Sequence, residues 1–323
     1  MFGLRGRCRC DGHVTDTTFL GLPAMGAERV GGEQPQVAIL GIPFGVTYPS
    51  PGHTAGCADA PEAIRARSRR LANFADHHDF DLDAPMLVGS PPLRIMDAGD
   101  VEGTAADGAG NVARAESAVR SLLAAGAIPI VLGGDDSVPI PVLRAYAGGK
   151  PLTVLQVDAH LDFRDEVAGV RDGYSSTMRR AAEMDHVERI VQVGLRGVGS
   201  ARTSDVADAR AAGNLLVTAR ELRARGVEWL LGELPHGAPV FIAFDLDGLD
   251  PSVAPAVSGV SPGGLSYDDA GDLVAGVAER CRVVGAAFTE LVPALDVNGI
   301  SALVVVRMVM RLLAGLDRNR VRA

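Results

Sequence analysis

Short apolar, β-branched runs alternate with amphipathic stretches along the chain, and this alternation constrains the fold more than any other feature. Seven of the runs are typical of strands: 36–42, 128–134, 152–158, 190–196, 215–219, 239–245 and 283–290. Four stretches between them repeat their apolar residues every three or four positions, as helices do: 61–74, 115–126, 221–235 and 266–281. Nearly continuous apolar strands separated by helices are typical of a parallel sheet covered on both faces. The pattern predicts an α/β fold with three layers, α-β-α, around a mainly parallel central sheet.

Length and composition predict one large domain. The chain has 323 residues, 47% of them hydrophobic, which is enough for a single extended core. We expect this domain to span residues 35–323, after a Gly- and Arg-rich arm over residues 1–34. The apolar stretch 300–316 is interrupted by Arg307 and Arg311 and is short for a membrane span, so we expect it to form a core-facing terminal helix.

Charge and cysteine content exclude several classes of function. The formal net charge is −9, and no basic block is present that could grip phosphates, which argues against a nucleic-acid partner. The cysteines Cys8, Cys10, Cys57 and Cys281 are too scattered for a disulfide framework and indicate free thiols in a reducing compartment. No signal peptide is recognisable. We therefore expect a cytoplasmic protein that does not bind membranes.

Three potential metal ligands follow the strand predicted at 152–158. Asp158, His160 and Asp162 stand at every second position, so in an extended segment their side chains would point to the same side. Two carboxylates and an imidazole crowded together without a cation would cost roughly several kcal/mol. The spacing therefore indicates that something positive lies among them.

Two other predicted strands end in carboxylates. Asp136 follows the strand at 128–134, and Asp245 and Asp247 follow the strand at 239–245. A single Asp before a turn is usually a structural cap, but in an open α/β sheet the carboxyl ends of strands form one rim. Taken together, five carboxylates and one imidazole favour Mn²⁺ or another divalent transition metal, and they are enough for two ions.

The motifs in which these ligands lie resemble those of a known family. GGDDS (133–137), DAHLD (158–162) and DLDGLDP (245–251) resemble, in order and spacing, the signatures of the ureohydrolases, which include arginase, agmatinase and related amidinohydrolases. GIPF, PGHTAGCADAPEAIR, DAGDV, GLRG and FTELVP add weaker matches, so the resemblance covers most of the chain from about residue 35 onward. It implies an arginase-like fold.

The resemblance also implies a ligand set and a reaction. Two manganese ions, bridged by hydroxide, would be held by two overlapping sets of side chains: Asp136, Asp158, Asp162 and Asp245 for one ion, and Asp158, His160, Asp245 and Asp247 for the other. Glu290 would pair with the guanidinium group of the substrate. Hydrolysis of a C–N bond would then give urea, or a substituted urea, and an amine. Nickel is the alternative metal.

The chain departs from the family pattern at two positions where a histidine is expected. Asp136 replaces one of them, and as a hard oxygen ligand it can still bind a divalent cation. Tyr174 replaces the histidine expected to shuttle protons; its phenol is a poor base near neutral pH but can donate a proton or a hydrogen bond. His53, in the loop after the first strand, is a candidate substitute for this shuttle.

The substrate and the assembly remain open at this stage. The loop by which arginases bind an amino acid is not recognisable after Asp162, so we expect another guanidino compound: agmatine, a guanidino acid, or an alkyl guanidine or biguanide. Arg164 and Arg171 are candidate ligands for a substrate carboxylate, although solvated loop charges explain them as well. The resemblance implies a trimer or hexamer.

Two other classes of protein fit parts of the pattern. A non-catalytic subunit could support an active paralogue in a mixed oligomer, because two histidine positions are substituted. A deacetylase with a related architecture would hold one zinc ion, but DAHLD and DLDGLDP fit that class less well. Metal stoichiometry distinguishes these readings: two, one or no ions per chain.

Overall fold

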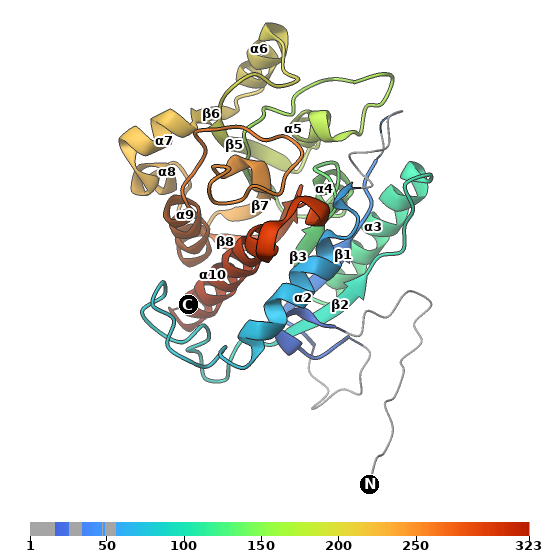
Figure 1. Cartoon of the computed structure of the whole chain (residues 1–323). Helices are drawn as coiled ribbons and strands as arrows, with labels where there is room; N and C mark the ends of the chain where they lie inside the picture. Colours follow the sequence, from blue (N-terminus) through green and yellow to red (C-terminus); the bar gives the residue numbers. More distant parts are fainter. Residues whose placement is uncertain (1–16, 26–33, 47, 49–55, 323) are drawn as a thin grey trace.

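One parallel sheet forms the centre of the molecule. The computed structural model describes residues 17–25, 34–46, 48 and 56–322. Eight strands, every neighbouring pair of which is parallel, lie in the order β2-β1-β3-β8-β7-β4-β5-β6 (Figure 1). Their bounds are β1 Val37–Ile42, β2 Ile95–Asp100, β3 Ile128–Gly133, β4 Leu152–Val157, β5 Val187–Leu195, β6 Leu215–Thr218, β7 Pro239–Asp245 and β8 Arg282–Thr289. The mainly parallel sheet predicted from the sequence is confirmed.

Helices cover both faces of this sheet. They are α2 Ala60–Ala72, α3 Gly108–Ala124, α4 Pro139–Arg144, α5 Thr177–Ala182, α6 Thr203–Ala211, α7 Ala219–Arg225, α8 Val227–Gly232, α9 Tyr267–Arg280 and α10 Ile300–Arg322. Successive strand residues point to opposite faces, so Ile39 belongs to the apolar core that includes α2 and α7 to α10, whereas Leu40 belongs to the core that includes α3 to α6. Two apolar cores result, one on each side, which is the predicted three-layer arrangement.

The seven strands predicted from apolar runs are all present, and one strand was not predicted. The missing strand is β2, with the sequence IMDAGD, which lies at the edge of the sheet beside β1. Its Asp97 and Asp100 interrupt the apolar run by which the other strands were predicted. Both form ion pairs with the buried Arg65 of α2. The buried guanidinium of Arg65 therefore compensates the negative charges of this edge strand.

The predicted helices are present, with one break. The stretch 221–235 forms α7 and α8, separated at Gly226, whose φ of +83° favours glycine. Helix α10 is long and apolar enough to cross a membrane, but 78% of its apolar window is buried inside the protein. It lies lengthwise beside α2 and α9 (Figure 1), so the expectation of a core-facing terminal helix is confirmed.

Part of the predicted N-terminal arm lies against the domain. The short 3-10 helix η1 (Phe19–Gly21) buries Phe19 and Leu20 in the core on the α2 side. The backbone N–H of Phe19 donates to Asp97 of β2, and that of Leu20 donates to Ser68 of α2. Residues 1–16 and 26–33 lie outside the described residues, so the boundary placed at residue 35 stays a prediction.

Candidate metal centre

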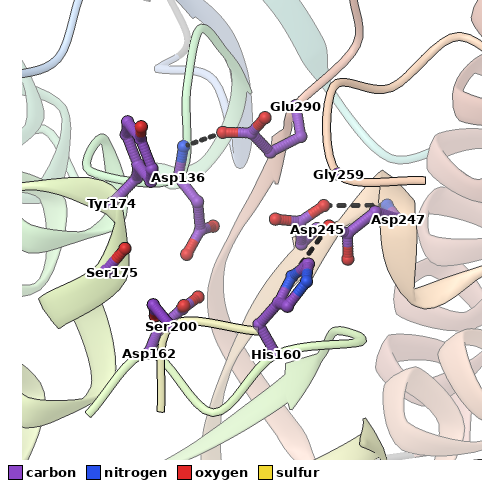
Figure 2. A pocket seen from close by; sticks show the side chains of 10 residues that line it. All are labelled: Asp136, His160, Asp162, Tyr174, Ser175, Ser200, Asp245, Asp247, Gly259 and Glu290. Carbon is purple, nitrogen blue, oxygen red and sulfur yellow. Dashed lines mark hydrogen bonds and ion pairs between the residues drawn. The ribbon is translucent and has the colours of Figure 1, made fainter. Parts of the chain in front are cut away.

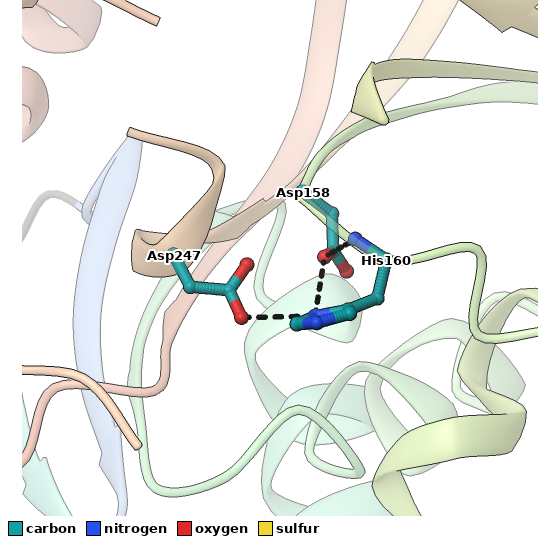
Figure 3. Close-up of side chains that lie close together, drawn as sticks. All are labelled: Asp158, His160 and Asp247. Atoms are coloured by element: carbon teal, nitrogen blue, oxygen red, sulfur yellow. Dashed lines mark hydrogen bonds and ion pairs between the residues drawn. The ribbon is translucent and has the colours of Figure 1, made fainter. Parts of the chain in front are cut away.

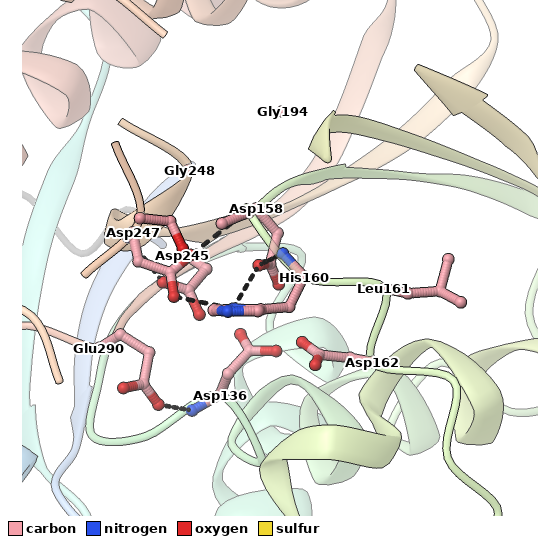
Figure 4. Close-up of polar contacts among 12 residues, drawn as sticks. Asp136, Asp158, His160, Leu161, Asp162, Gly194, Asp245, Asp247, Gly248 and Glu290 are labelled. Carbon is pink, nitrogen blue, oxygen red and sulfur yellow. Dashed lines mark hydrogen bonds and ion pairs between the residues drawn. The ribbon is translucent and has the colours of Figure 1, made fainter. Parts of the chain in front are cut away.

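The four central strands bring the predicted ligands together. β3, β8, β7 and β4 are neighbours in the sheet although they are far apart in the sequence. Just beyond or at their carboxyl ends lie Asp136, Glu290, Asp245 and Asp158, respectively. Figure 4 shows these side chains converging with His160, Asp162 and Asp247 from separate loops. The crossovers of a parallel sheet therefore produce one cluster from motifs up to 154 residues apart.

A cavity of about 210 Å³ opens at this point. Figure 2 shows the side chains that surround it: Asp136, His160, Asp162, Tyr174, Ser175, Ser200, Asp245, Asp247, Gly259 and Glu290. Five of the six predicted metal ligands line the cavity, and the sixth, Asp158, is completely buried directly behind His160. The structure thus brings all six together.

Asp158 belongs to two groups of potential ligands. One group is Asp136, Asp158 and Asp162, the other is Asp158, His160 and Asp247, and within each group the ligand atoms lie within 4.8 Å of one another. Figure 3 shows His160 between the two carboxylates of the second group, with Nδ1 3.0 Å from Asp247 and 3.5 Å from Asp158. A carboxylate shared between two groups is the arrangement expected for a pair of adjacent cations.

Burial makes the cluster unfavourable without a cation. Burial and the neighbouring carboxylates raise the pKa values of Asp136, Asp162 and Asp245 well above the usual range, and burial with Asp247 raises the pKa of Asp158 to about 6. One oxygen of Asp136, Oδ2, is buried without a hydrogen-bond partner. Buried carboxylates with an unsatisfied oxygen fit a site for divalent metal ions.

His160 is the only nitrogen ligand in the two groups. Hydrogen bonds to Asp158 and then Asp247 raise its pKa to about 10, because both carboxylates favour the imidazolium form. Glycines pack against the ring: a Cβ on Gly199 would lie 2.5 Å from His160 Cδ2, and one on Gly259 would lie 3.0 Å from Cε1. The ring is therefore held in one place, where metal binding would replace the proton.

Two residues of the site have left-handed backbone conformations that non-glycine residues rarely adopt. Asp162 has φ +45° and Glu290 has φ +70°. Such conformations cost of order 1–3 kcal/mol and persist only where surrounding contacts impose them. For Asp162, the backbone N–H groups of Met178 and Arg179 donate to its carbonyl oxygen at 3.0 and 3.2 Å. The fold thus stabilises strained backbone conformations that set the direction of these two carboxylates.

Glu290 is fixed beside Asp136 by the chain itself. The backbone N–H of Asp136 donates to Glu290 Oε1 at 2.8 Å, and the buried Cys57 thiol lies 3.9 Å from Oε2. Thr289, the last residue of β8, donates through its hydroxyl to Asp136 Oδ1 at 2.7 Å. Two adjacent residues at the end of β8 therefore hold Asp136 in place: Glu290 binds its backbone, and Thr289 binds its carboxylate.

Tyr174 lines the cavity, where the resemblance places a missing histidine. Its ring packs edge-on against Tyr48, with 4.5 Å between the ring centroids. Burial and the neighbouring Tyr48 raise the pKa of Tyr174 to about 12. Its phenol is therefore protonated at neutral pH, so it can donate a hydrogen bond or a proton but cannot act as a base.

Two other predicted site residues, Arg164 and Arg171, do not line the cavity. Arg164 forms an ion pair with Asp205 at 3.2 Å, and the exposed Arg171 pairs with Asp165 and Glu183. Neither arginine is among the residues that line the cavity, and their predicted contact with a substrate carboxylate has no support from this arrangement. His53 lies outside the described residues, and its role as a proton shuttle stays a prediction.

The structure adds residues that sequence patterns did not single out. Arg196 donates to backbone carbonyls of β5 and of two segments after β7, including those of Asp247 at 2.6 Å and Ser261 at 2.6 Å. Ser200 and Gly259 also line the cavity. The GLRG motif contains Arg196, but only the fold reveals that its guanidinium fixes the loop carrying Asp247.

Comparison with known proteins places this site in a family. Residues 35–315 match the model of the arginase family. A guanidinopropionase from Pseudomonas aeruginosa is 32% identical over 296 residues, which cover 89% of each protein, and a guanidinobutyrase from the same species is 29% identical over 289 residues, 86% of each. The structure of proclavaminate amidino hydrolase from Streptomyces clavuligerus is similar with a TM-score of 0.81 and 27% identity, covering 95% of this chain and 98% of that one.

Proposed function

The chain belongs to the arginase family of amidinohydrolases, and on that premise we propose that it is a binuclear, metal-dependent hydrolase of a guanidino compound. Hydrolysis of a C–N bond would give urea and an amine. One observation carries the proposal: Asp158 is shared by two ligand groups at the wall of a cavity that Glu290 also lines. Six of the ten residues that line the cavity lie in the sequence motifs.

Each side chain has a role in this proposal. Asp136, Asp158 and Asp162 would hold one ion, Asp158, His160 and Asp247 the other, and Asp245 faces the same cavity. Two divalent cations held there would supply a water-derived nucleophile at neutral pH and stabilise the charge that develops on attack. Manganese is the metal we propose, with nickel as the alternative, because hard carboxylates dominate the ligand set.

Glu290 and Tyr174 would act on the substrate directly. Glu290 presents a buried carboxylate to the cavity, and a planar guanidinium with paired N–H donors is a suitable partner for it. Tyr174 holds its proton at neutral pH and would donate to the leaving amine as the C–N bond breaks. This division of roles requires no histidine at position 174.

The substrate class is a guanidino compound other than arginine. Support comes from relatives named guanidinopropionase and guanidinobutyrase, and from a structural neighbour named proclavaminate amidino hydrolase. A suitable panel is 3-guanidinopropionate, 4-guanidinobutyrate, agmatine, arginine, an alkyl guanidine and a biguanide. A cytoplasmic location and a trimeric or hexameric assembly stay predictions, which fractionation and sedimentation analysis would address.

The direct test is urea release by the protein supplied with Mn²⁺ or Ni²⁺. The wild type should release urea from at least one panel member. Asp158→Asn removes the ligand that both groups share, so kcat/KM should fall at least ~100-fold. The matched control, Asp268→Asn, changes an exposed carboxylate at the start of α9 and should leave turnover unchanged. Full turnover by Asp158→Asn would contradict the proposal, and a folded wild type with neither bound metal nor urea release would favour a non-catalytic subunit.

A further inference from the structure

Two glutamines interrupt the apolar strands next to the metal centre. Gln156 of β4 and Gln192 of β5 are buried and lie opposite each other in the strand register. Asn214, directly before β6, is also buried. An amide left unsatisfied in such a place costs about 1–3 kcal/mol, so each group needs partners. Their hydrogen bonds form a continuous series from the edge of the sheet to the proposed metal ligands.

The three amides form one chain of hydrogen bonds. Asn214 Nδ2 donates to Gln192 Oε1 at 2.9 Å, and Gln192 Nε2 donates to Gln156 Oε1 at 2.6 Å. Gln156 Nε2 then donates to Asp158 Oδ2 at 2.6 Å and to Asp162 Oδ2 at 3.4 Å. We call Asn214, Gln192 and Gln156 the amide chain. It ends on carboxylates of two proposed ligands.

A backbone carbonyl fixes the direction of this chain. Gln192 Nε2 also donates to the carbonyl oxygen of Leu161 at 2.8 Å. A carbonyl can only accept, so the NH₂ group of Gln192 must face Leu161 and Gln156. Gln156 must in turn direct its carbonyl oxygen to Gln192 and its NH₂ group to the carboxylates. The amide chain thus always offers donors to Asp158 and Asp162.

The amide chain also holds the strained backbone of Asp162. Gln192 binds the carbonyl of Leu161, directly before Asp162, while Gln156 binds the Asp162 side chain. These contacts act on both sides of the residue whose φ is +45°. Without them, Asp162 could relax to an ordinary conformation and turn its carboxylate away from Asp136 and Asp158.

We propose that Gln156 is a positioning residue for the ion held by Asp136, Asp158 and Asp162, and that Gln192 and Asn214 orient it. The inference rests on the proposed function, since it presupposes ions at this centre. Gln156 contacts two of the three ligands in this group, but only the shared Asp158 in the group that contains His160 and Asp247. Its loss should therefore weaken one ion more than the other.

The test counts bound Mn²⁺ per chain by equilibrium dialysis over a range of free Mn²⁺, with no substrate present. Wild-type protein should bind two ions. Gln156→Met keeps the side-chain length but removes the donors, and it should weaken one of the two ions about 10- to 100-fold while changing the other less than about threefold. Asn214→Ala, which lies at the far end of the amide chain, should weaken the same ion by a smaller factor.

Val154→Ala is the matched control, because Val154 is a completely buried residue of the same strand two positions before Gln156. It should lower the unfolding temperature and leave both ions bound with unchanged affinity. Equal weakening of both ions by Gln156→Met, unchanged binding in that variant, or a selective loss in Val154→Ala would overturn the inference. If Gln156→Met does not fold, Asn214→Ala decides. A wild type that binds no Mn²⁺ would overturn the proposed function and this inference together. If the wild type binds two ions, the proposed function stands and the variants test this inference alone.

Discussion

Asp136 and Tyr174 stand where the resemblance implies histidines, and both line the cavity. Asp136 has one oxygen bound by Thr289 and the other buried without a hydrogen-bond partner. Asp136 lies in the ligand group with Asp158 and Asp162, so it can bind a cation in place of an imidazole. The substitution adds negative charge to the centre and preserves a ligand atom there.

Replacing Tyr174 with Phe tests the role proposed for its hydroxyl. The variant keeps the ring that packs against Tyr48 but removes the proton that would go to the leaving amine. We expect kcat to fall about 100-fold, with KM and the number of bound ions little changed. Steady-state kinetics on the best panel substrate measure this. An unchanged kcat would show that another donor acts in its place.

Residue types and spacing predicted the candidate metal ligands, which the structure brings together, but not the residues that hold these side chains. Asp158, His160 and Asp162 could be found because a period of two after a strand has few explanations. Gln192 and Thr289 make contacts between strands that are distant in the sequence, and no local pattern reveals these. Gln156 is close to Asp158 in the sequence, but its contact with Gln192 appears only in the fold. Arg164 and Arg171 were proposed as substrate ligands by charge alone, and the structure pairs both with neighbouring acids.

At the scale of elements, apolar runs identify strands that are buried between two helix layers. The edge strand β2 was not predicted because it contains Asp97 and Asp100, whose charges are neutralised by ion pairs with Arg65, a residue of α2 about 30 positions earlier. Arg65 is completely buried and also donates to the carbonyl of Gly99. Ion pairing across elements cannot be read from a window of sequence, and here it replaces apolar packing at the edge of the sheet.

Arg65→Met should therefore destabilise the protein strongly. The variant keeps most of the side-chain volume but leaves Asp97 buried without its cation, so the free energy of unfolding should fall by about 3–5 kcal/mol. Denaturant unfolding followed by circular dichroism measures the change. Arg69→Met, an exposed position on the same helix, is the control and should change stability by less than about 0.5 kcal/mol. Similar stabilities for the two variants would refute the role assigned to Arg65.

At the scale of the whole molecule, the strand order decides where the chemistry lies. The chain visits β3, β4, β7 and β8 in sequence, yet the sheet places them as β3, β8, β7 and β4. The crossovers collect five aspartates and Glu290 at one rim, in a protein whose formal charge is already −9. Alternating elements predicted a parallel sheet, but the order of its strands depends on contacts between helices and sheet faces. A cluster this acidic makes the stability of the protein depend on cations.

The metal-free protein should lose stability as pH rises from about 5 to 7.5. Burial raises the pKa of Asp158 to about 6 and those of Asp136, Asp162 and Asp245 well above the usual range, so these groups bind protons more tightly when folded. Their contribution is complete below the unfolded pKa near 4 and is lost as pH rises through the folded values, by up to ~1.4 kcal/mol per pH unit for each group.

Thermal unfolding with and without Mn²⁺ across this pH range measures the effect. The unfolding temperature of the metal-free protein should fall with pH, and the difference made by Mn²⁺ should grow, because cations replace the protons among the carboxylates. Asp158→Asn removes one of the ionising groups and should flatten the metal-free curve. A metal-free protein whose stability rises over this range would be inconsistent with the raised pKa values of these buried carboxylates.

The central claim is that Asp158 joins two metal sites in one centre, and the most direct measurement is the number of divalent ions bound per chain. We expect two Mn²⁺ or Ni²⁺ ions per chain in the wild type at saturation, determined by elemental analysis after removal of free metal. Asp158→Asn should lose both together, since each ligand group contains this residue. A wild type that saturates at one ion, or an Asp158→Asn variant that keeps two, would contradict the shared site.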